Sequence, residues 1–131
     1  MKTKTLKQKV NFKASPHDVY ELIMDSKKHA EFTNSKVKIT KKIGNKFSAY
    51  DGYIEGINLK LVPDKEIVQK WRANHWPQGY FSKATFLLKK SKDGTVLTFT
   101  QTGIPAEDYE SKRTGWIEHY WEPMKKMLEK K

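Results

Sequence analysis

Four polar side chains fall on strand faces that are otherwise apolar, and chemistry is most readily expected from these positions. They are Gln8, Glu55, Gln69 and Gln101. A buried polar group without a partner costs about 1–3 kcal/mol, so each needs a hydrogen bond or water. Two interpretations stay open: positions near the sheet rim, with Gly56 shifting the register, or the wall of a partly hydrated cavity. An inward Glu55 is also a candidate for a raised pKa.

The side chains that most often perform catalysis form no recognisable set. The chain has no cysteine, and its histidines lack metal-binding spacing. The four histidines are His17, His29, His75 and His119. No nucleophile elbow or phosphate-binding glycine motif is present. Glu107, Asp108 and Glu110 lie close together, but negative charge at a helix start suits the helix dipole. The sequence therefore predicts no enzyme, no metal and no cofactor.

Large aromatic side chains are spread over several expected strands and the C-terminal region. An apolar pocket with a few polar groups is the usual form of a small-molecule site. We therefore expect a ligand cavity between sheet and helix, although the same side chains would also suffice to fill that space. The expected lining residues are Tyr53, Glu55, Gln69, Trp71, Trp76, Tyr80, Phe86, Phe99, Gln101, Trp116, Tyr120 and Met124.

One amphipathic helix, predicted over residues 105–131, must position many of these groups. Pro105 suits its first turn, where a missing N–H costs nothing. Lys125, Lys126 and Lys130 place positive charge near its end, as the helix dipole favours. Apolar residues recur mostly at steps of three, four and seven. They are Tyr109, Trp116, Ile117, Tyr120, Trp121, Met124, Met127 and Leu128.

Two residues interrupt this helical pattern. Gly115 predicts a bend or a close approach of another group. Pro123 has no N–H to donate to the carbonyl of His119, so it predicts a kink.

Two short helices are expected near the start of the chain. Ser15 is suited to cap a helix that begins at Pro16 and runs to about residue 24. Asp25 or Ser26 is suited to cap a second helix that ends near residue 33.

Most of the remaining sequence alternates between apolar and polar residues, which is typical of strands. The expected strands span residues 5–13, 36–40, 46–50, 53–62, 66–72, 80–89 and 95–102. In the strand over residues 53–62, the expected inward side chains are Tyr53, Glu55, Ile57, Leu59 and Leu61. Short turns imply an antiparallel sheet, and one long helix covers one face of it. We therefore predict a single α+β domain over residues 1–131 with a helix-grip fold, in which a curled seven-stranded sheet wraps the helix.

The net charge of +11 raises the question of a nucleic-acid partner. Arg72 and Arg113 are the only arginines among 26 basic residues, and the lysines are spread along the chain. Bidentate recognition of bases and phosphates favours arginine, so no specific nucleic-acid binding is expected. An acidic protein surface fits the same lysines. With no long apolar run and no secretory signal, we expect a cytoplasmic protein without a membrane span.

Three blocks of sequence resemble the heat-shock-protein-90 ATPase activator family. The blocks are residues 67–72 with 76–80 and Ser82, residues 97–105 with 109–110, and residues 115–116 with 120–125. Together they extend over most of residues 5–128 and resemble the family's C-terminal domain, which belongs to the START-like helix-grip superfamily. The resemblance implies the helix-grip fold, a cavity that in many members holds an apolar ligand, and a chaperone partner. It implies no catalytic set.

Activators of the eukaryotic type carry an additional N-terminal domain, for which 131 residues leave no room. We therefore expect a non-enzymatic, chaperone-associated module that gives little ATPase stimulation by itself. The alternative is a carrier or sensor that binds a small hydrophobic ligand in the cavity. An enzyme of the cyclase or hydrolase kind found in the wider superfamily is a third possibility, but no residue set supports it.

Overall fold

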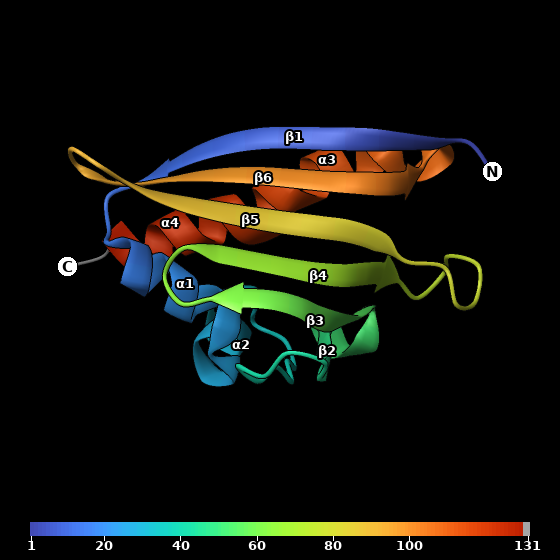
Figure 1. Ribbon diagram of the computed structural model, residues 1–131, viewed down its shortest axis with the longest axis horizontal. Coiled ribbons are helices and arrows are strands. Elements are labelled where there is room, and N and C mark those ends of the chain that lie inside the picture. Colours follow the sequence, from blue (N-terminus) through green and yellow to red (C-terminus); the bar gives the residue numbers. More distant parts are fainter. Residues whose placement is uncertain (130–131) are drawn as a thin grey trace.

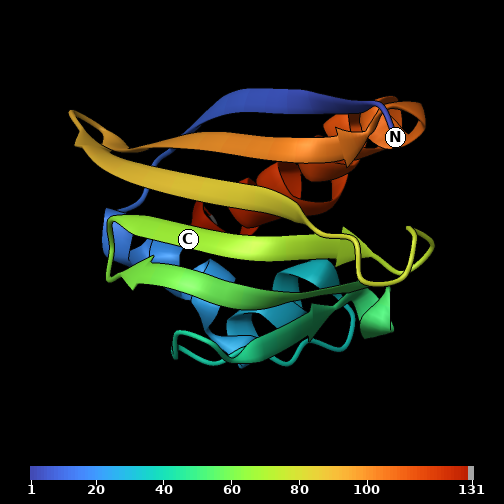
Figure 2. The same ribbon diagram turned by 45° about the vertical axis from the view of Figure 1, so that its right-hand side comes forward.

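Six strands form one antiparallel sheet that curls around a long C-terminal helical region (Figure 1). This computed structural model describes residues 1–129. The strand order across the sheet is β1-β6-β5-β4-β3-β2. The strands are β1 (Thr3–Phe12), β2 (Lys46–Ala49), β3 (Ile54–Val62), β4 (Glu66–Ala73), β5 (Ser82–Ser91) and β6 (Gly94–Pro105). The helices lie on one side of the sheet in two views, which confirms the predicted helix-grip arrangement (Figures 1 and 2).

The two short helices after β1 form as expected. They are α1 (Pro16–Met24) and α2 (Ser26–Thr33). The Ser15 hydroxyl accepts a hydrogen bond from the Asp18 N–H at 3.1 Å, and the Asp25 carboxylate accepts one from the Lys28 N–H at 3.0 Å. Each bond satisfies one of the free N–H groups at a helix start, which is why both helices begin where the sequence predicts.

The C-terminal helical region consists of four segments. They are the 3₁₀ turn η2 (Ala106–Asp108), the α-helix α3 (Tyr109–Trp116), the π-helical segment η3 (Ile117–Trp121) and the α-helix α4 (Glu122–Glu129). Pro105 ends β6 and does not open the helix, so its predicted place in the first helical turn is wrong. Lys130 and the predicted helix end at residue 131 lie outside the described residues, and the single domain over residues 1–131 stays a prediction.

A π-helical segment, Ile117–Trp121, directly precedes the turn of α4 that contains Pro123, where a kink was expected. The carbonyl of His119 has no N–H donor at Pro123. The hydroxyl of Tyr50, in the 3₁₀ turn η1 (Tyr50–Gly52), donates to that carbonyl at 2.8 Å. A side chain from the sheet side of the molecule therefore replaces a helical hydrogen bond.

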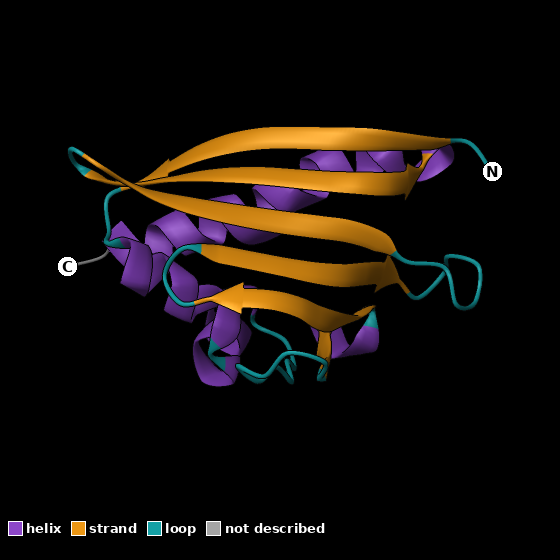
Figure 3. Ribbon diagram, viewed as in Figure 1, coloured by secondary structure: helices purple, strands orange, loops and turns teal. Residues whose placement is uncertain are grey.

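The expected seventh strand, over residues 36–40, does not form (Figure 3). Its one ladder contact is an isolated bridge between Lys38 and Ser48. Side chains hold this segment instead. The Ser26 hydroxyl bonds to both the N–H and the carbonyl of Ile39 at 2.8 Å, and Asn58 donates to the Thr40 carbonyl at 2.8 Å. These bonds replace the partners that a continuous strand would have needed.

The face assignment predicted for residues 53–62 is wrong. Ile54 and Asn58 are buried, whereas Glu55 is exposed on the outer face. A Cβ at Gly56 would lie 1.9 Å from the Lys70 carbonyl oxygen and 2.6 Å from the Phe47 ring, so the neighbouring backbone and this ring leave no room for a side chain. The buried face of β3 therefore carries a glycine and an asparagine. The apolar residues that alternate along this strand lie mostly on the outer face, which is why the alternation predicted the wrong buried face.

Ile57 and Leu59 share the outer side of β3 with Glu55, and the pairing with β4 shifts between Asn58 and Lys60. Leu61, beyond this irregularity, is partly buried. Within residues 1–129, we find no helix with the length and apolar character that crossing a bilayer requires.

Candidate functional site

A layer of aromatic rings fills most of the space between the sheet and the C-terminal helix. Trp116 lies at its centre and is only 3% exposed. Its ring centroid lies 4.4 Å from that of Phe99, 4.7 Å from that of Tyr120 and 5.4 Å from that of Trp121. Rings at these separations are in packing contact, so the side chains occupy much of the expected cavity themselves.

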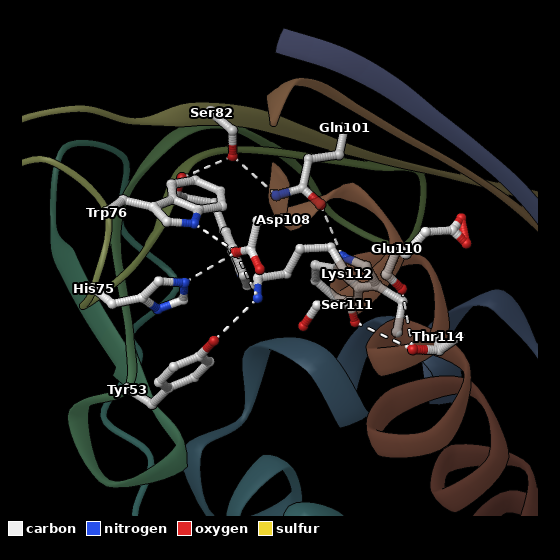
Figure 4. A network of polar contacts seen from close by, with 12 residues as sticks. Tyr53, His75, Trp76, Ser82, Gln101, Asp108, Glu110, Ser111, Lys112 and Thr114 are labelled. Atoms are coloured by element: carbon white, nitrogen blue, oxygen red, sulfur yellow. Dashed lines mark hydrogen bonds and ion pairs between the residues drawn. The ribbon is translucent and has the colours of Figure 1, made fainter. Parts of the chain in front are cut away.

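Hydrogen bonds inside the protein satisfy the two buried glutamines, Gln69 and Gln101, of which Figure 4 shows Gln101. The Gln101 amide donates to the Ser82 hydroxyl at 2.9 Å and accepts from Trp116 Nε1 at 2.8 Å. Gln69 donates to the side-chain oxygen of Asn58 at 3.2 Å. Both side chains are buried, and neither needs a bound water or ligand to satisfy the groups named here.

The two other polar positions have different surroundings. Gln8 is half-buried; it donates to the Arg113 carbonyl at 3.0 Å and accepts from Trp121 Nε1 at 2.7 Å, so it joins β1 to the helix. Glu55 lies outside the sheet, where it pairs with Arg72 at 3.0 Å and keeps about half of its side chain exposed at 52%. The expected inward position of Glu55 is therefore wrong, because β3 presents its other face to the core.

An open groove remains between the start of β3 and the C-terminal helix. Its volume is about 520 Å³. Gly115 forms part of the helix wall, where a Cβ would meet no atom closer than the His119 ring at 4.0 Å. The close approach expected at Gly115 is therefore wrong, and the missing side chain leaves the groove open. The other lining residues are Tyr50, Tyr53, Ile54, Trp71, Ser111, Lys112, Thr114, Trp116, Glu118, His119 and Tyr120.

The structure brings four of the twelve expected ligand-site residues to this groove. They are Tyr53, Trp71, Trp116 and Tyr120. Six others are buried in the core, namely Gln69, Trp76, Phe86, Phe99, Gln101 and Met124. Trp76 and Tyr80 lie in the connection from β4 to β5, where Tyr80 donates to the Gly103 carbonyl. That the twelve residues bind a ligand stays a prediction.

A polar cluster lies beside the groove (Figure 4). The Asp108 carboxylate accepts from Trp76 Nε1 at 2.7 Å and from Lys112 Nζ at 2.9 Å, and it lies 3.2 Å from His75 Nε2. Lys112 also donates to the Tyr53 hydroxyl at 3.0 Å. The side chains of Asp108 and Lys112 are 13% and 7% exposed, so the ion pair is nearly buried.

Hydrogen bonds keep this carboxylate charged. Burial by itself would raise the pKa of Asp108, but the bonds from Trp76 and Lys112 outweigh it and hold the pKa below its ordinary 3.8. The sequence pattern assigned Asp108 to the helix dipole and missed Lys112. Their spacing of four residues was the available signal, because such residues are neighbours on one helix face.

A buried histidine that the sequence did not single out supports the other end of the aromatic layer. His29 Nδ1 lies 2.9 Å from the Ile23 carbonyl, which only accepts, so Nδ1 carries the proton. Nε2 then accepts from the Tyr120 hydroxyl at 2.8 Å. Burial lowers the pKa of His29 from 6.5 to about 4, because it disfavours the charged ring.

The groove has the character of a binding surface. Within residues 1–129, no three metal-binding side chains gather where they would hold an ion. The groove offers aromatic surfaces with one lysine–tyrosine pair at its side, which are groups that hold an apolar molecule or a partner's side chain.

Comparison with known proteins identifies one family whose sequence pattern this chain matches. Residues 13–129 match the family described as Activator of Hsp90 ATPase homolog 1-like protein. A Dictyostelium discoideum activator of 90 kDa heat shock protein ATPase homolog is 41% identical over 117 residues, which are 87% of this chain and 30% of that protein. The human activator homolog 1 is 35% identical over 121 residues, 92% of this chain and 35% of that one. The chain thus spans about a third of these relatives' length.

Solved structures show the same fold. An HSP90 activator from Plasmodium falciparum has a TM-score of 0.86 at 21% identity, covering 97% of this chain and 96% of that one. The Aha1 dimer from Colwellia psychrerythraea has a TM-score of 0.82 at 18% identity, covering 97% of each chain.

Proposed function

Because this chain belongs to the family of Activator of Hsp90 ATPase homolog 1-like proteins, we propose that it is a non-enzymatic module that binds a heat-shock-protein-90 chaperone. The supporting observation is the match over residues 13–129, together with 41% identity to a relative named as an activator of that chaperone's ATPase. A cytoplasmic location belongs to the same proposal.

The surface charge favours a weak association that depends on salt. A net charge of +11 accelerates encounter with an acidic patch of a partner. Most of the lysines are exposed, and at about 0.15 M ionic strength the screening length is about 8 Å. Added salt should therefore weaken these contacts.

Binding and ATPase stimulation need not occur together. The matched region is about a third of these relatives' length, so the surface that it shares with them is only part of theirs. Small interfaces are typically transient. We therefore expect this chain alone to bind the chaperone with little or no stimulation of ATP turnover.

The test is a titration of the chaperone into fluorescently labelled protein at low and at physiological ionic strength, with ATP turnover followed in parallel. We expect binding that is clearly tighter at low ionic strength, and turnover close to that of the chaperone alone. No binding at low ionic strength would contradict the proposed partner. Strong stimulation would show that the remaining part of the relatives is dispensable for activation.

The groove supports a second candidate function, the carriage or sensing of a small hydrophobic ligand. Its volume of about 520 Å³ lies within the range of about 300–1,000 Å³ typical of small-molecule sites. Rings of Trp71, Trp116 and Tyr120 supply the apolar wall, and Lys112 with Tyr53 supplies a polar side. These functions do not exclude one another.

Native mass spectrometry of freshly purified protein tests this second function. We expect a copurified mass that is lost in Gly115→Leu, because a leucine at this position extends into the open groove. Gly115→Ala is the matched control, since its methyl group meets the His119 ring only at ordinary contact distance. A mass retained in Gly115→Leu, or none in the parent protein, would contradict binding in this groove.

A further inference from the structure

The two edges of the sheet differ in length and in cover. One edge is β2, which has four residues and is bridged by Lys38 of the preceding segment. The other is β1, which has ten residues and pairs with β6 on one side. Within residues 1–129, no strand lies on its other side (Figure 1). Every second residue of such a strand turns its N–H and carbonyl away from the sheet, where another chain can bind them.

The charge along this edge is of one sign. Residues 1–17 contain five lysines and no Asp or Glu. Leu6, Val10 and Phe12 face the core, so the exposed Lys7 and Lys9 point to the outer face of the sheet. They lie opposite Thr100 and Thr98 of β6, which carry no charge.

Lys7 and Lys9 have no charged partner in the described part of the chain, where each ion pair involves other residues. The nearby helix contributes Arg113, which pairs with Glu110 at 2.9 Å. The edge therefore presents free backbone groups beside uncompensated positive charge.

This combination disfavours a second copy of the same chain. Pairing β1 with β1 of another molecule would bring the lysines of the two strands together, and like charges on facing strands are destabilising. Each copy also carries a net charge of +11, which adds repulsion at longer range. A strand of opposite charge meets neither penalty.

We propose that the free edge of β1 binds an extended acidic peptide segment as a seventh strand of the sheet. The binding stretch is residues 6–12, because the pairing with β6 runs without interruption from Leu6 to Phe12 and shifts register between Lys4 and Leu6. Backbone hydrogen bonds supply affinity in this mode of recognition, and alternate side chains supply specificity.

The lysine spacing defines the segment that fits. Side chains of a paired strand alternate between faces, so acidic residues at every second position lie together on the outer face, beside Lys7 and Lys9. The inference concerns peptide chemistry and does not depend on a chaperone being the partner.

The test uses a fluorescently labelled peptide of about eight residues, in which glutamate alternates with valine or threonine, long enough to span residues 6–12. A second peptide of equal charge has two central residues replaced by proline, which removes backbone donors. Affinity is measured by fluorescence anisotropy at low ionic strength, and amide hydrogen exchange is measured across the protein.

Two protein variants carry the same change of charge. Lys7→Glu/Lys9→Glu reverses the charge at the proposed edge, and Lys27→Glu/Lys28→Glu reverses it on α2, at the opposite side of the molecule (Figure 1). The alternating peptide should bind the parent protein and slow exchange of alternate amides within residues 6–12. Lys7→Glu/Lys9→Glu should weaken it by about tenfold more than Lys27→Glu/Lys28→Glu.

Four outcomes would overturn the proposal. Equal affinity of the two peptides would mean that charge alone holds the peptide. Equal weakening of peptide binding by the two protein variants would mean the same. Protection confined to residues outside β1 would place the peptide elsewhere. Dimerisation through β1 without peptide would show that the edge accepts a second copy of the chain.

Discussion

Replacing Trp116 by alanine tests whether the aromatic layer holds the helix onto the sheet. The side chain is 3% exposed and lies against Phe99, Tyr120 and Trp121 with centroids 4.4–5.4 Å away. Deleting a buried aromatic side chain costs about 3–5 kcal/mol, because surrounding groups relax only partly into the hole. We expect a loss of that size in the free energy of unfolding.

A second substitution separates packing from hydrogen bonding. Trp116→Phe keeps much of the ring contact but removes the Nε1 donor, which bonds to Gln101 at 2.8 Å. A buried carbonyl oxygen left without a donor costs about 1–3 kcal/mol, so this variant should lose less than the alanine variant. Ile117→Ala is the matched control on the same helix. Ile117 is 37% exposed, and surface substitutions usually change stability by less than about 0.5 kcal/mol.

Urea unfolding followed by far-ultraviolet circular dichroism measures all three variants without relying on tryptophan fluorescence. The slope of the free energy against urea should stay constant, so that a shifted midpoint reports stability. A loss below about 1 kcal/mol for Trp116→Ala would refute the reasoning, because it would mean that the side chain is not enclosed. A loss for Ile117→Ala equal to that of Trp116→Ala would refute it as well.

Three further predictions concern the same region. Neutral His29 contributes stability that is complete above pH 6.5 and is lost as the pH falls towards 4, since the unfolded chain then binds a proton that the folded chain does not. The loss amounts to at most about 3 kcal/mol, and melting curves should show His29→Gln to be less sensitive over this pH range than the parent. Tyr50→Phe should lower the free energy of unfolding, measured in urea, by about 0.5–1.5 kcal/mol, because it removes the bond to the His119 carbonyl. The loss should be smaller in a Pro123→Ala background, where a backbone N–H can replace that bond, and equal losses in both backgrounds would contradict this account. Gly115→Ala should increase the free energy of unfolding by up to about 1 kcal/mol and so raise the melting temperature, because alanine favours the helix and fits the open groove. A lower melting temperature would mean that the position is crowded.

Much of the architecture could be predicted because its signals are local. Alternation identified β1, β4 and β6, and the caps Ser15 and Asp25 identified the starts of α1 and α2. Each signal acts within a few residues, so it survives whatever the remainder of the chain does. The large apolar residues at helical spacing likewise predicted which side of the C-terminal helix meets the sheet, except at exposed Ile117.

The failed predictions involve positions where a distant residue decides the outcome. The inward face of β3 was misassigned because its inward positions carry Asn58 and Gly56, where the Lys70 carbonyl and the Phe47 ring leave no room for a side chain. The strand expected over residues 36–40 was lost to side-chain bonds from Ser26 and Asn58. A pattern of hydropathy contains no information about which side chain from elsewhere occupies a space or takes a backbone hydrogen bond.

The candidate sites show the same division. The sequence by itself determined the family, the cysteine-free composition, the positive charge and the lysines of β1. Only the tertiary structure decided that His29 bonds to Tyr120, 91 positions away, that the inward glutamines bond inside the core, and that a groove stays open at Gly115. The physical reason is that burial and hydrogen-bond partnership are properties of pairs brought together by folding, whereas charge and helical or strand periodicity are carried by each stretch of chain alone.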